Sequence, residues 1–268
     1  MSPRRRLLLA LLAAAVLVAA VVVVGRLVAT RGPAVAPDAR PAQDVLGPVL
    51  LVPGYGGAGA ALEPLAGRIR ATGRTATVVA LPGNGTGDLA AQVDALDRAV
   101  DGALAAGAPS VDVVGYSAGG VVAGLWVARD DGAAKARRVV TLGAPLAGTS
   151  LAATASVIAP DACPAACRQL APGSAEITEL ERDRVGEALP WLAVWTADDE
   201  TVTPPEAAAR LAGTVQVQLQ AVCPGARVTH SALPTDPAVT GVVLRALSAD
   251  PLGGAVTGVD CADLRAAR

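Results

Sequence analysis

The chain has 268 residues and a formal net charge of −2; 52% of its residues are hydrophobic and 17% are charged. These proportions exclude a disordered chain and a coiled coil, and the length is sufficient for one domain with a sizeable core. No run of basic residues follows the first thirty, so we do not expect nucleic acid as a partner.

Residues 1–29 are expected to form a targeting segment. Three arginines at positions 4–6 precede an unbroken apolar stretch over residues 7–24. This stretch is longer than the core of a signal peptide, about 7–15 residues, and approaches the ~20 residues of a membrane-spanning helix. We expect an N-terminal hydrophobic helix that is retained as a signal anchor, with a cleaved signal peptide as the alternative. In both cases the arginines keep the N-terminus cytoplasmic and place the rest of the chain outside the cytoplasm.

The rest of the chain is expected to be a proline-containing linker over residues 30–47 and one domain over residues 48–268. The strands expected in this domain are residues 49–52, 75–81, 111–115, 139–142, 191–196 and 215–219. The expected helices are residues 60–71, 88–106, 119–129, 205–211 and 237–247. Residues 146–188 are less regular and could form a small cap or lid. Continuously apolar strands between helices are typical of a parallel sheet that is covered on both faces. We therefore predict an α/β fold with a small, mostly parallel sheet of about six strands and helices on both faces.

The main chemical signal is the pattern G-x-S-x-G at residues 115–119. An apolar strand pattern runs into it and a helical pattern runs out of it, which is the strand–turn–helix of a nucleophile elbow. Such a turn leaves no room for side chains at Gly115 and Gly119, and it lifts the hydroxyl of Ser117 above the sheet. An ordinary glycine-rich turn with a capping serine is the alternative.

A serine hydroxyl needs a base that takes its proton. The only histidine, His230, lies in the loop after the last expected strand. Asp198 and Asp199 directly follow the strand expected at 191–196, where one of them could orient the imidazole. A lone histidine is often structural, and an acidic pair after a strand is often only a solvated turn. The order Ser, Asp, His nevertheless matches that of the α/β-hydrolases and differs from chymotrypsin and subtilisin.

Two backbone N–H groups are expected to bind the developing oxyanion. One belongs to Ala118, directly after the nucleophile, and the other to the loop Pro-Gly-Tyr-Gly-Gly at residues 53–57. This loop could instead be a plain turn or a phosphate cradle. It lacks the glycine and lysine patterns of nucleotide-binding loops, so we do not expect a nucleotide cofactor.

Four cysteines, Cys163, Cys167, Cys223 and Cys261, all follow the N-terminal segment, as disulfides formed outside the cytoplasm would. Four cysteines allow three pairings. We expect Cys163–Cys167, because four positions across Pro164 suit a local clip, and Cys223–Cys261 by elimination. A zinc site is the alternative, but the spacings match no common ligand set and the only histidine is needed for catalysis.

Several motifs, taken in order, resemble those of the small bacterial triacylglycerol lipases and esterases of the α/β-hydrolase superfamily. They are LVPGYGG at 51–57, GYSAGG at 115–120, TLGAP at 141–145 with Gly148-Thr149, DETVTP at 199–204 and HSAL at 230–233. The resemblance spans about residues 48–247 and implies that fold and a reaction without metal or cofactor.

The same resemblance refines two residue assignments. The acid of the family stands three residues before a valine, which selects Asp199, and its oxyanion residue follows the glycine of the first loop, which selects Tyr55. Many members carry His-Gly in place of Pro53-Gly54 and histidine in place of Leu146. Because of these departures, the substrate preference of the family is not carried over with the triad.

The sequence thus predicts an extracytoplasmic serine hydrolase that cleaves carboxylic esters, in particular lipid or acylglycerol esters, through an acyl-enzyme. Ser117, His230 and Asp199 would form the triad, and Tyr55 and Ala118 would bind the oxyanion. One alternative is another acyl-transfer enzyme on this fold: a peptidase, a thioesterase or an acyltransferase. The other is a non-catalytic, membrane-anchored binding domain. The expected partners are the ester substrate and, through the N-terminal segment, a membrane; no obligate protein partner is implied.

Overall fold

The structure is a computed structural model that describes Arg5 and residues 40–57, 59–256 and 258–267. The chain divides into two units, Met1–Ala34 and Val35–Arg268, and the description below concerns the second. The hydrophobic helix expected over 1–29 lies outside the described residues except for Arg5, and most of the expected linker does too. Among the described helices, none is both long and apolar enough to cross a membrane.

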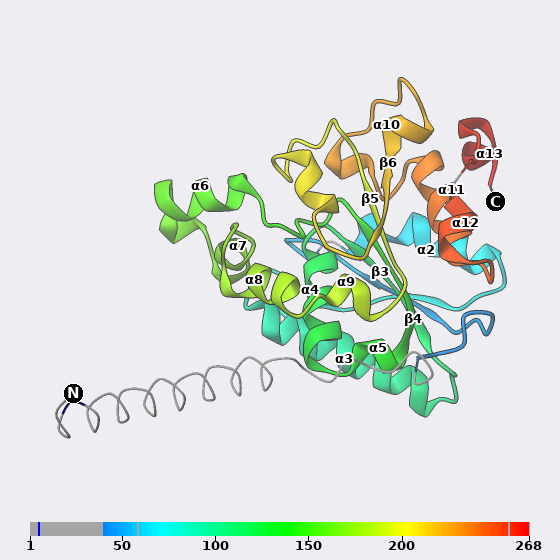
Figure 1. The fold of residues 1–268 in the computed structure, drawn as a ribbon, viewed down its shortest axis with the longest axis horizontal. Helices are drawn as coiled ribbons and strands as arrows, with labels where there is room; N and C mark the ends of the chain where they lie inside the picture. The colour runs from blue at the N-terminus through cyan, green and yellow to red at the C-terminus, as the bar shows by residue number, and fades with distance from the viewer. Residues whose placement is uncertain (1–4, 6–39, 58, 257, 268) are drawn as a thin grey trace. The chain divides into compact units, whose positions relative to one another are not determined.

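Six parallel strands form one sheet, in the order β2-β1-β3-β4-β5-β6. Figure 1 labels β3 to β6 of this sheet. The strands are β1 (Val49–Val52), β2 (Ala76–Val78), β3 (Val111–Tyr116), β4 (Ala136–Leu142), β5 (Trp191–Trp195) and β6 (Val215–Gln218). The predicted sheet of about six strands is therefore confirmed, and every pair of neighbouring strands is parallel. The chain passes from β1 outward to β2 and then crosses over β1 to β3, from which it continues in the opposite direction, so the strand order reverses between β1 and β3. In open parallel sheets, ligand sites lie at the carboxyl ends of strands beside such a reversal.

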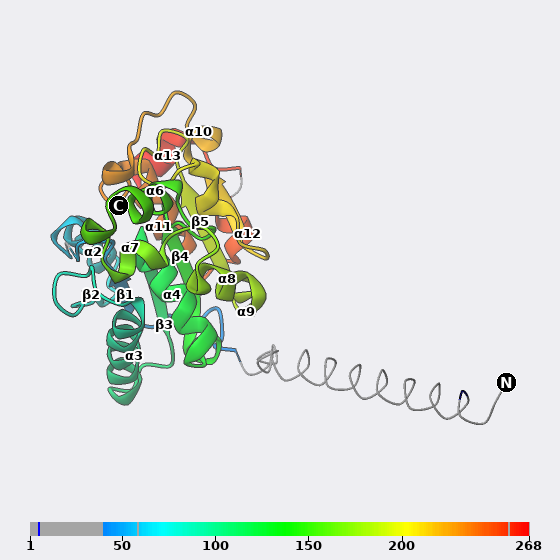
Figure 2. The same cartoon turned by 90° about the vertical axis from the view of Figure 1, so that its left-hand side faces the viewer.

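Helices cover both faces of the sheet, because alternate residues of each buried strand point to opposite sides. Leu50 and Val52 contribute to one apolar cluster, and Val49 and Leu51 contribute to the other. The helices with residues in the first cluster are α3 (Leu89–Ala105), α4 (Ala118–Arg129), α5 (Gly132–Lys135), α6 (Ser150–Ile158), α7 (Ala165–Gln169), α8 (Ala175–Arg182) and α9 (Val185–Ala188). Those with residues in the second are α2 (Glu63–Ala71), α10 (Leu219–Val222), α11 (Pro237–Ala246), α12 (Leu252–Val256) and α13 (Cys261–Ala266). On the first face α3 and α4 pack side by side (Figure 2).

Most of the expected elements are present, with shifted ends. The Asp88 side chain caps α3 by accepting a hydrogen bond from the N–H of Ala90 at 2.9 Å, as its position before the helix predicts. The helix expected at 205–211 is a short 3-10 helix, Pro205–Ala209. The irregular region 146–188 contains four short helices, α6 to α9, and a 3-10 turn at Pro160–Ala162. Further 3-10 turns lie at Gly59–Ala61 and His230–Ala232.

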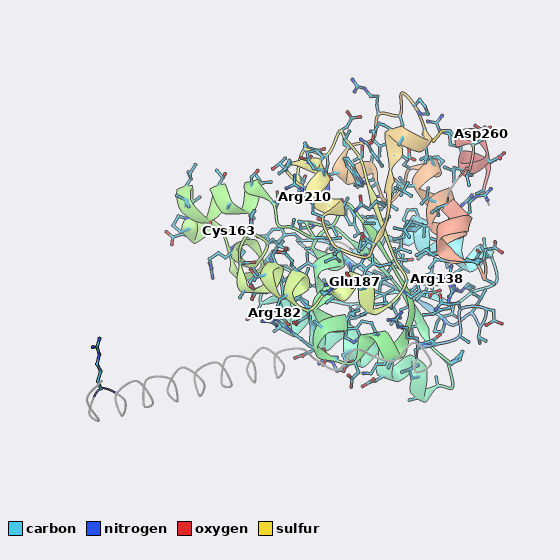
Figure 3. The ribbon with its side chains drawn as sticks, in the orientation of Figure 1. Arg138, Cys163, Arg182, Glu187, Arg210 and Asp260 are labelled. Atoms are coloured by element: carbon cyan, nitrogen blue, oxygen red, sulfur yellow. A yellow bond between two sulfur atoms is a disulfide. The ribbon has the colours of Figure 1, made fainter. Side chains whose placement is uncertain are left out.

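A buried ionic network explains why β4 begins before its expected start at residue 139. Asp112 and Arg137 are completely buried and pair through two hydrogen bonds, and Arg74 donates to the same carboxylate at 2.6 Å. Arg138, labelled in Figure 3, donates to the carbonyls of Ala246 and Asp250. Burial lowers the pKa of Arg138 to about 10, and the neighbouring Arg137 acts in the same direction. Two adjacent arginines do not predict the start of a buried strand. Their burial is possible here because each guanidinium group has hydrogen-bond partners.

Two disulfides link the cysteines in the expected pairs. Cys163, just before α7, is joined to Cys167 within that helix, and Cys223 at the end of α10 is joined to Cys261 at the start of α13. These bonds suit an oxidising compartment outside the cytoplasm.

Candidate active site

Ser117 stands in the turn between β3 and α4, with a backbone conformation of φ 53° and ψ −127°. Residues with a side chain rarely adopt positive φ, and those that do are often found at functional sites. The strand before Ser117 and the helix after it hold this conformation. The turn therefore presents the hydroxyl at the carboxyl ends of the strands.

The glycines around Ser117 permit the tight turn that the sequence predicts. A Cβ atom on Gly115 would stand 2.5 Å from the Cα of Gly120, and one on Gly119 would stand 2.2 Å from the carbonyl oxygen of Val52. Neither position can hold a side chain without moving the backbone.

His230 lies in a 3-10 turn between α10 and α11, and its imidazole bridges two side chains. Its Nε2 is 2.9 Å from the Oγ of Ser117, and its Nδ1 is 2.8 Å from Oδ2 of Asp199. The other carboxylate oxygen of Asp199 accepts hydrogen bonds from the N–H groups of Thr201 and Val202. These two bonds fix the carboxylate so that Oδ2 faces the imidazole.

The structure distinguishes the two candidate aspartates that follow β5. Asp199 contacts His230, whereas Asp198 pairs with Arg227 at 3.1 Å and lies near the amide of Gln220. Asp199 is 4% exposed and Asp198 is partly exposed. Of the two aspartates, therefore, only Asp199 is placed to orient the histidine.

Burial of the Ser117–His230–Asp199 line favours directional hydrogen bonds. Ser117 is 8% exposed, His230 is 5% exposed and Asp199 is 4% exposed, so the three groups are largely shielded from water. Buried polar groups interact more strongly than exposed ones because water competes less for them. The arrangement can transfer a proton from the serine to the imidazole while the carboxylate stabilises the resulting cation.

Comparison with known proteins gives a match in structure only. Neither a protein-family model nor a curated protein sequence matches the chain. Lipase B of Aspergillus fumigatus matches with a TM-score of 0.68 and 19% identity, covering 82% of this chain and 56% of that one. The mature form of the Bacillus licheniformis lipase BlEst2 matches with a TM-score of 0.62 and 17% identity, covering 81% of this chain and 94% of that one. This chain thus spans little more than half the length of the Aspergillus protein.

The fold is that of the α/β-hydrolases. The sequence motifs indicate a resemblance to lipases. This resemblance is confirmed at the level of the fold, since lipases are among the solved structures that match the chain. In this fold the nucleophile follows a central strand, as Ser117 follows β3.

The first loop of the hydrolase fold, residues 53–57, lies beside Ser117. A Cβ atom on Gly54 would stand 2.9 Å from the Cβ of Ser117, so only glycine lets the loop approach this closely. Ala118 begins α4, where backbone N–H groups lack intrahelical partners. Tyr55, in the first loop, is 44% exposed.

Three further residues of this site were not predicted from the sequence. The hydroxyl of Tyr116 donates to the backbone carbonyl of His230 at 3.2 Å, and Glu200 accepts from the backbone N–H of His230 at 3.0 Å. The hydroxyl of Thr149 contacts the backbone of the loop that follows Asp199. Each of them is adjacent to a motif residue or lies within a motif, but only the tertiary structure shows what it contacts.

Burial raises the pKa of Tyr116 to about 12, and the negative charges of Asp199 and Glu200 act in the same direction. The phenol therefore remains protonated, and remains a hydrogen-bond donor, at any pH near neutrality.

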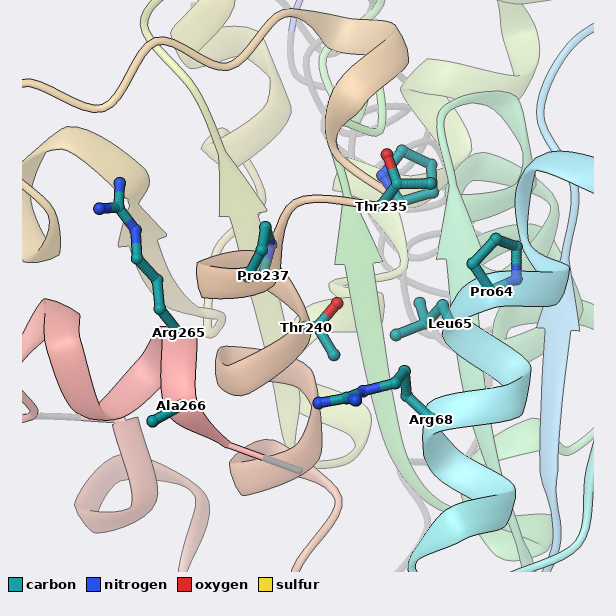
Figure 4. A pocket seen from close by; sticks show the side chains of 9 residues that line it. Pro64, Leu65, Arg68, Thr235, Pro237, Thr240, Arg265 and Ala266 are labelled. Atoms are coloured by element: carbon teal, nitrogen blue, oxygen red, sulfur yellow. The ribbon is translucent and has the colours of Figure 1, made fainter.

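A surface pocket of about 540 Å³ lies elsewhere, between α2, α11 and α13 (Figure 4). Its lining includes Arg68, Thr240 and Arg265 but none of the three residues of the hydrogen-bonded line. This pocket is therefore separate from the Ser117–His230–Asp199 site. In the part of the chain that the structure describes, no three His, Cys, Asp or Glu side chains are grouped as metal ligands.

Proposed function

We propose that the protein is a serine hydrolase that cleaves carboxylic esters through an acyl-enzyme intermediate. The observation that carries the proposal is the continuous hydrogen-bonded line from the hydroxyl of Ser117 through His230 to Asp199, at the carboxyl ends of the strands. The α/β-hydrolase fold supports it, because this fold places a Ser-His-Asp triad at the same location.

In the proposed reaction, Oγ of Ser117 attacks the ester carbonyl while Nε2 of His230 takes the hydroxyl proton. Asp199 accepts the Nδ1–H hydrogen bond and stabilises the imidazolium. The backbone N–H groups of Tyr55 and Ala118 bind the tetrahedral oxyanion. His230 then gives its proton to the departing alcohol, which leaves an acyl group on Ser117. Water, deprotonated by the same imidazole, attacks the acyl carbonyl and releases the acid and the free serine.

We further propose lipid or acylglycerol esters as the substrate class. Helix α6 supports this, because Leu151, Val157 and Ile158 on it are exposed and the helix carries no charge. Its N-cap, Thr149, contacts the loop that follows Asp199, so this apolar surface begins beside the site. Exposed apolar patches often bind apolar ligands or surfaces. The names of the Aspergillus and Bacillus neighbours as lipases point in the same direction.

The two disulfides and the apolar N-terminal stretch support a location outside the cytoplasm. We propose that residues 1–29 direct export and act as a membrane anchor, with residues 30–47 as the linker to a hydrolase domain over 48–268.

A substrate panel tests the proposed activity. Purified protein would be assayed with p-nitrophenyl esters of increasing acyl length, with an acyl thioester and with peptide p-nitroanilides. We expect ester turnover that exceeds anilide and thioester turnover, with kcat/KM rising as the acyl chain lengthens. Ser117→Ala and His230→Ala should each lower kcat by at least about 10³-fold, and the double variant should be hardly worse, because the residues act as a unit. Ester turnover that survives Ser117→Ala would overturn the proposal, and faster anilide turnover would assign the site to a peptidase.

A further inference from the structure

The backbone of His230 is held at both of its polar groups by side chains. Glu200 accepts a hydrogen bond from its N–H at 3.0 Å, and the phenol of Tyr116 donates to its carbonyl oxygen at 3.2 Å. The ring of Tyr116 also packs against the imidazole, with the ring centroids 5.2 Å apart and the planes tilted by 32°.

These two side chains are the chain neighbours of the residues that His230 contacts. Tyr116 directly precedes Ser117, and Glu200 directly follows Asp199. The segment that carries Ser117 and the segment that carries Asp199 therefore each contact the imidazole and also hold the backbone of His230. A shift of either segment would move His230 with it, so the two distances within the line remain matched.

The loop that carries His230 needs such support. It runs from the end of α10 to the start of α11 and contains one 3-10 turn, His230–Ala232. Other attachments precede the histidine: the buried hydroxyl of Thr196 donates to the carbonyl oxygen of Val228 at 2.8 Å, and Arg227 pairs with Asp198 at 3.1 Å. The backbone of the histidine itself is held by the side-chain hydrogen bonds of Tyr116 and Glu200.

From these contacts we infer that Tyr116 and Glu200 are positioning residues, which fix the imidazole between Ser117 and Asp199 by holding the His230 backbone. The inference rests on the proposed function, because it gives His230 the role of general base. A displacement of about 1 Å in a catalytic group can cost on the order of 10²-fold in rate. In the described part of the chain, Tyr116 and Glu200 form side-chain hydrogen bonds to the His230 backbone and not to the Ser117 hydroxyl or the Asp199 carboxylate, so their effect passes through the histidine.

Three single variants separate positioning from general stability. Tyr116→Phe removes the hydrogen-bond donor and keeps the ring, while Glu200→Ala removes the acceptor. Glu200→Gln keeps an acceptor oxygen at the same place and removes only the charge. Glu206→Ala is the matched control, since Glu206 is an exposed glutamate that pairs with Arg210. Glu200 is itself exposed, so its replacement leaves the core unchanged.

Each variant would be assayed for kcat and KM with a soluble p-nitrophenyl ester, on the pH-independent plateau of its own profile, together with its melting temperature. We expect Tyr116→Phe and Glu200→Ala each to lower kcat by about 3–30-fold, with KM changed by less than about twofold, because loss of one hydrogen bond displaces the base but leaves substrate binding intact. Glu200→Gln should retain at least about half of the wild-type kcat, and Glu206→Ala should equal wild type.

A lowered melting temperature with unchanged kcat in both variants would overturn the inference and leave a stabilising role only. A loss in Glu200→Gln as large as that in Glu200→Ala would also overturn it, because charge would then matter in place of the hydrogen bond. Ser117→Ala, assayed alongside, separates this failure from failure of the proposed function. If Ser117→Ala is inactive while Tyr116→Phe and Glu200→Ala equal wild type, only the positioning role fails; if Ser117→Ala is active, the proposed function fails first.

Discussion

At the scale of single residues, backbone geometry and side-chain chemistry meet at Ser117. Its positive φ is a conformation that costs about 1–3 kcal/mol for a residue with a side chain. The neighbouring strand and helix offset this cost through their own packing and hydrogen bonds. What the conformation achieves is a hydroxyl within hydrogen-bond distance of Nε2 of His230.

The titration of Tyr116 is a prediction at this scale. The protein has only two tyrosines, and the pKa of Tyr116 is raised to about 12 by burial, with added repulsion from Asp199 and Glu200. The phenolate absorbance of the folded protein should therefore contain a step near pH 12 that Tyr116→Phe lacks. Between about pH 10 and 12 the unfolded chain has lost this proton while the folded chain keeps it, so the free energy of unfolding should fall as pH rises. An absorbance titration of both proteins checks this, and a variant with an unchanged profile would contradict it.

The sequence singles out Ser117, His230 and Asp199 because their residue types and chain order match a Ser-Asp-His pattern, and the structure brings the three side chains together. It does not reveal Tyr116 or Glu200, which act through bonds to the backbone. Backbone bonds leave no pattern in the residue types, and these two depend on how the loop after α10 folds over β3 and β5.

At the scale of helices and strands, the exposed surface of α6 leads to a second prediction. Val157 and Ile158 are 79% and 78% exposed. Burial of such a side chain contributes roughly 1.5–3 kcal/mol, and each 1.4 kcal/mol corresponds to about tenfold in affinity. The double variant Val157→Asp and Ile158→Asp should therefore lower the rate on dispersed long-chain esters by about tenfold or more, and leave the rate on soluble short-chain esters unchanged. Val45→Asp, at another exposed valine before β1, is the control; equal rates on both substrates in the α6 variant would argue against a lipid-binding role for this helix.

The disulfide between Cys223 and Cys261 gives a third prediction. It closes 38 positions that include His230, and the chain-entropy model assigns about 4 kcal/mol to a loop of that size. Cys223→Ser with Cys261→Ser should lower the melting temperature and, if the bond also keeps His230 in register, kcat as well. The four-position Cys163–Cys167 disulfide is the matched comparison, with about 2 kcal/mol in the same model. Assays at a temperature where the variants are folded would distinguish the roles: an unchanged kcat would leave the Cys223–Cys261 bond as purely stabilising.

Strands and long helices could be predicted from apolar runs and 3.6-residue spacing, but two kinds of element could not. Helices α12 and α13 were not expected, and α13 lies against α11 at Gly241, where a Cβ atom would stand 2.0 Å from the carbonyl oxygen of Leu264. Such close packing depends on two segments meeting in space. The first residues of β4 were missed because Arg137 and Arg138 are charged, and their burial is tolerable because Asp112, the side chain of Gln43 and distant carbonyls accept their hydrogen bonds.

At the scale of the whole molecule, the sheet separates stability from chemistry. The buried network around Asp112 lies at the amino ends of β3 and β4, whereas Ser117 lies beyond the carboxyl end of β3. Substitutions in the network should therefore act on folding, and substitutions at the carboxyl ends should act on rate.

The location of the whole chain is a fourth prediction. If residues 1–29 export the domain and retain it, an alkaline-phosphatase fusion after residue 45 should be active and should sediment with membranes. The expectation rests on the arginines at 4–6 and the apolar stretch over 7–24. A mature protein that lacks the first thirty residues would replace the anchor with a cleaved signal peptide, and an inactive fusion would contradict export itself.

The most direct test of the central claim is covalent labelling with a fluorophosphonate, followed by mass mapping of the modified peptide. This reagent reacts with a serine whose hydroxyl is activated by a neighbouring base. The account predicts one adduct per chain, located on Ser117, with a labelling rate at least about 10²-fold lower in His230→Ala. Absence of an adduct on the folded protein, or an adduct on another serine that persists in Ser117→Ala, would contradict the claim that Ser117, His230 and Asp199 form a working catalytic triad.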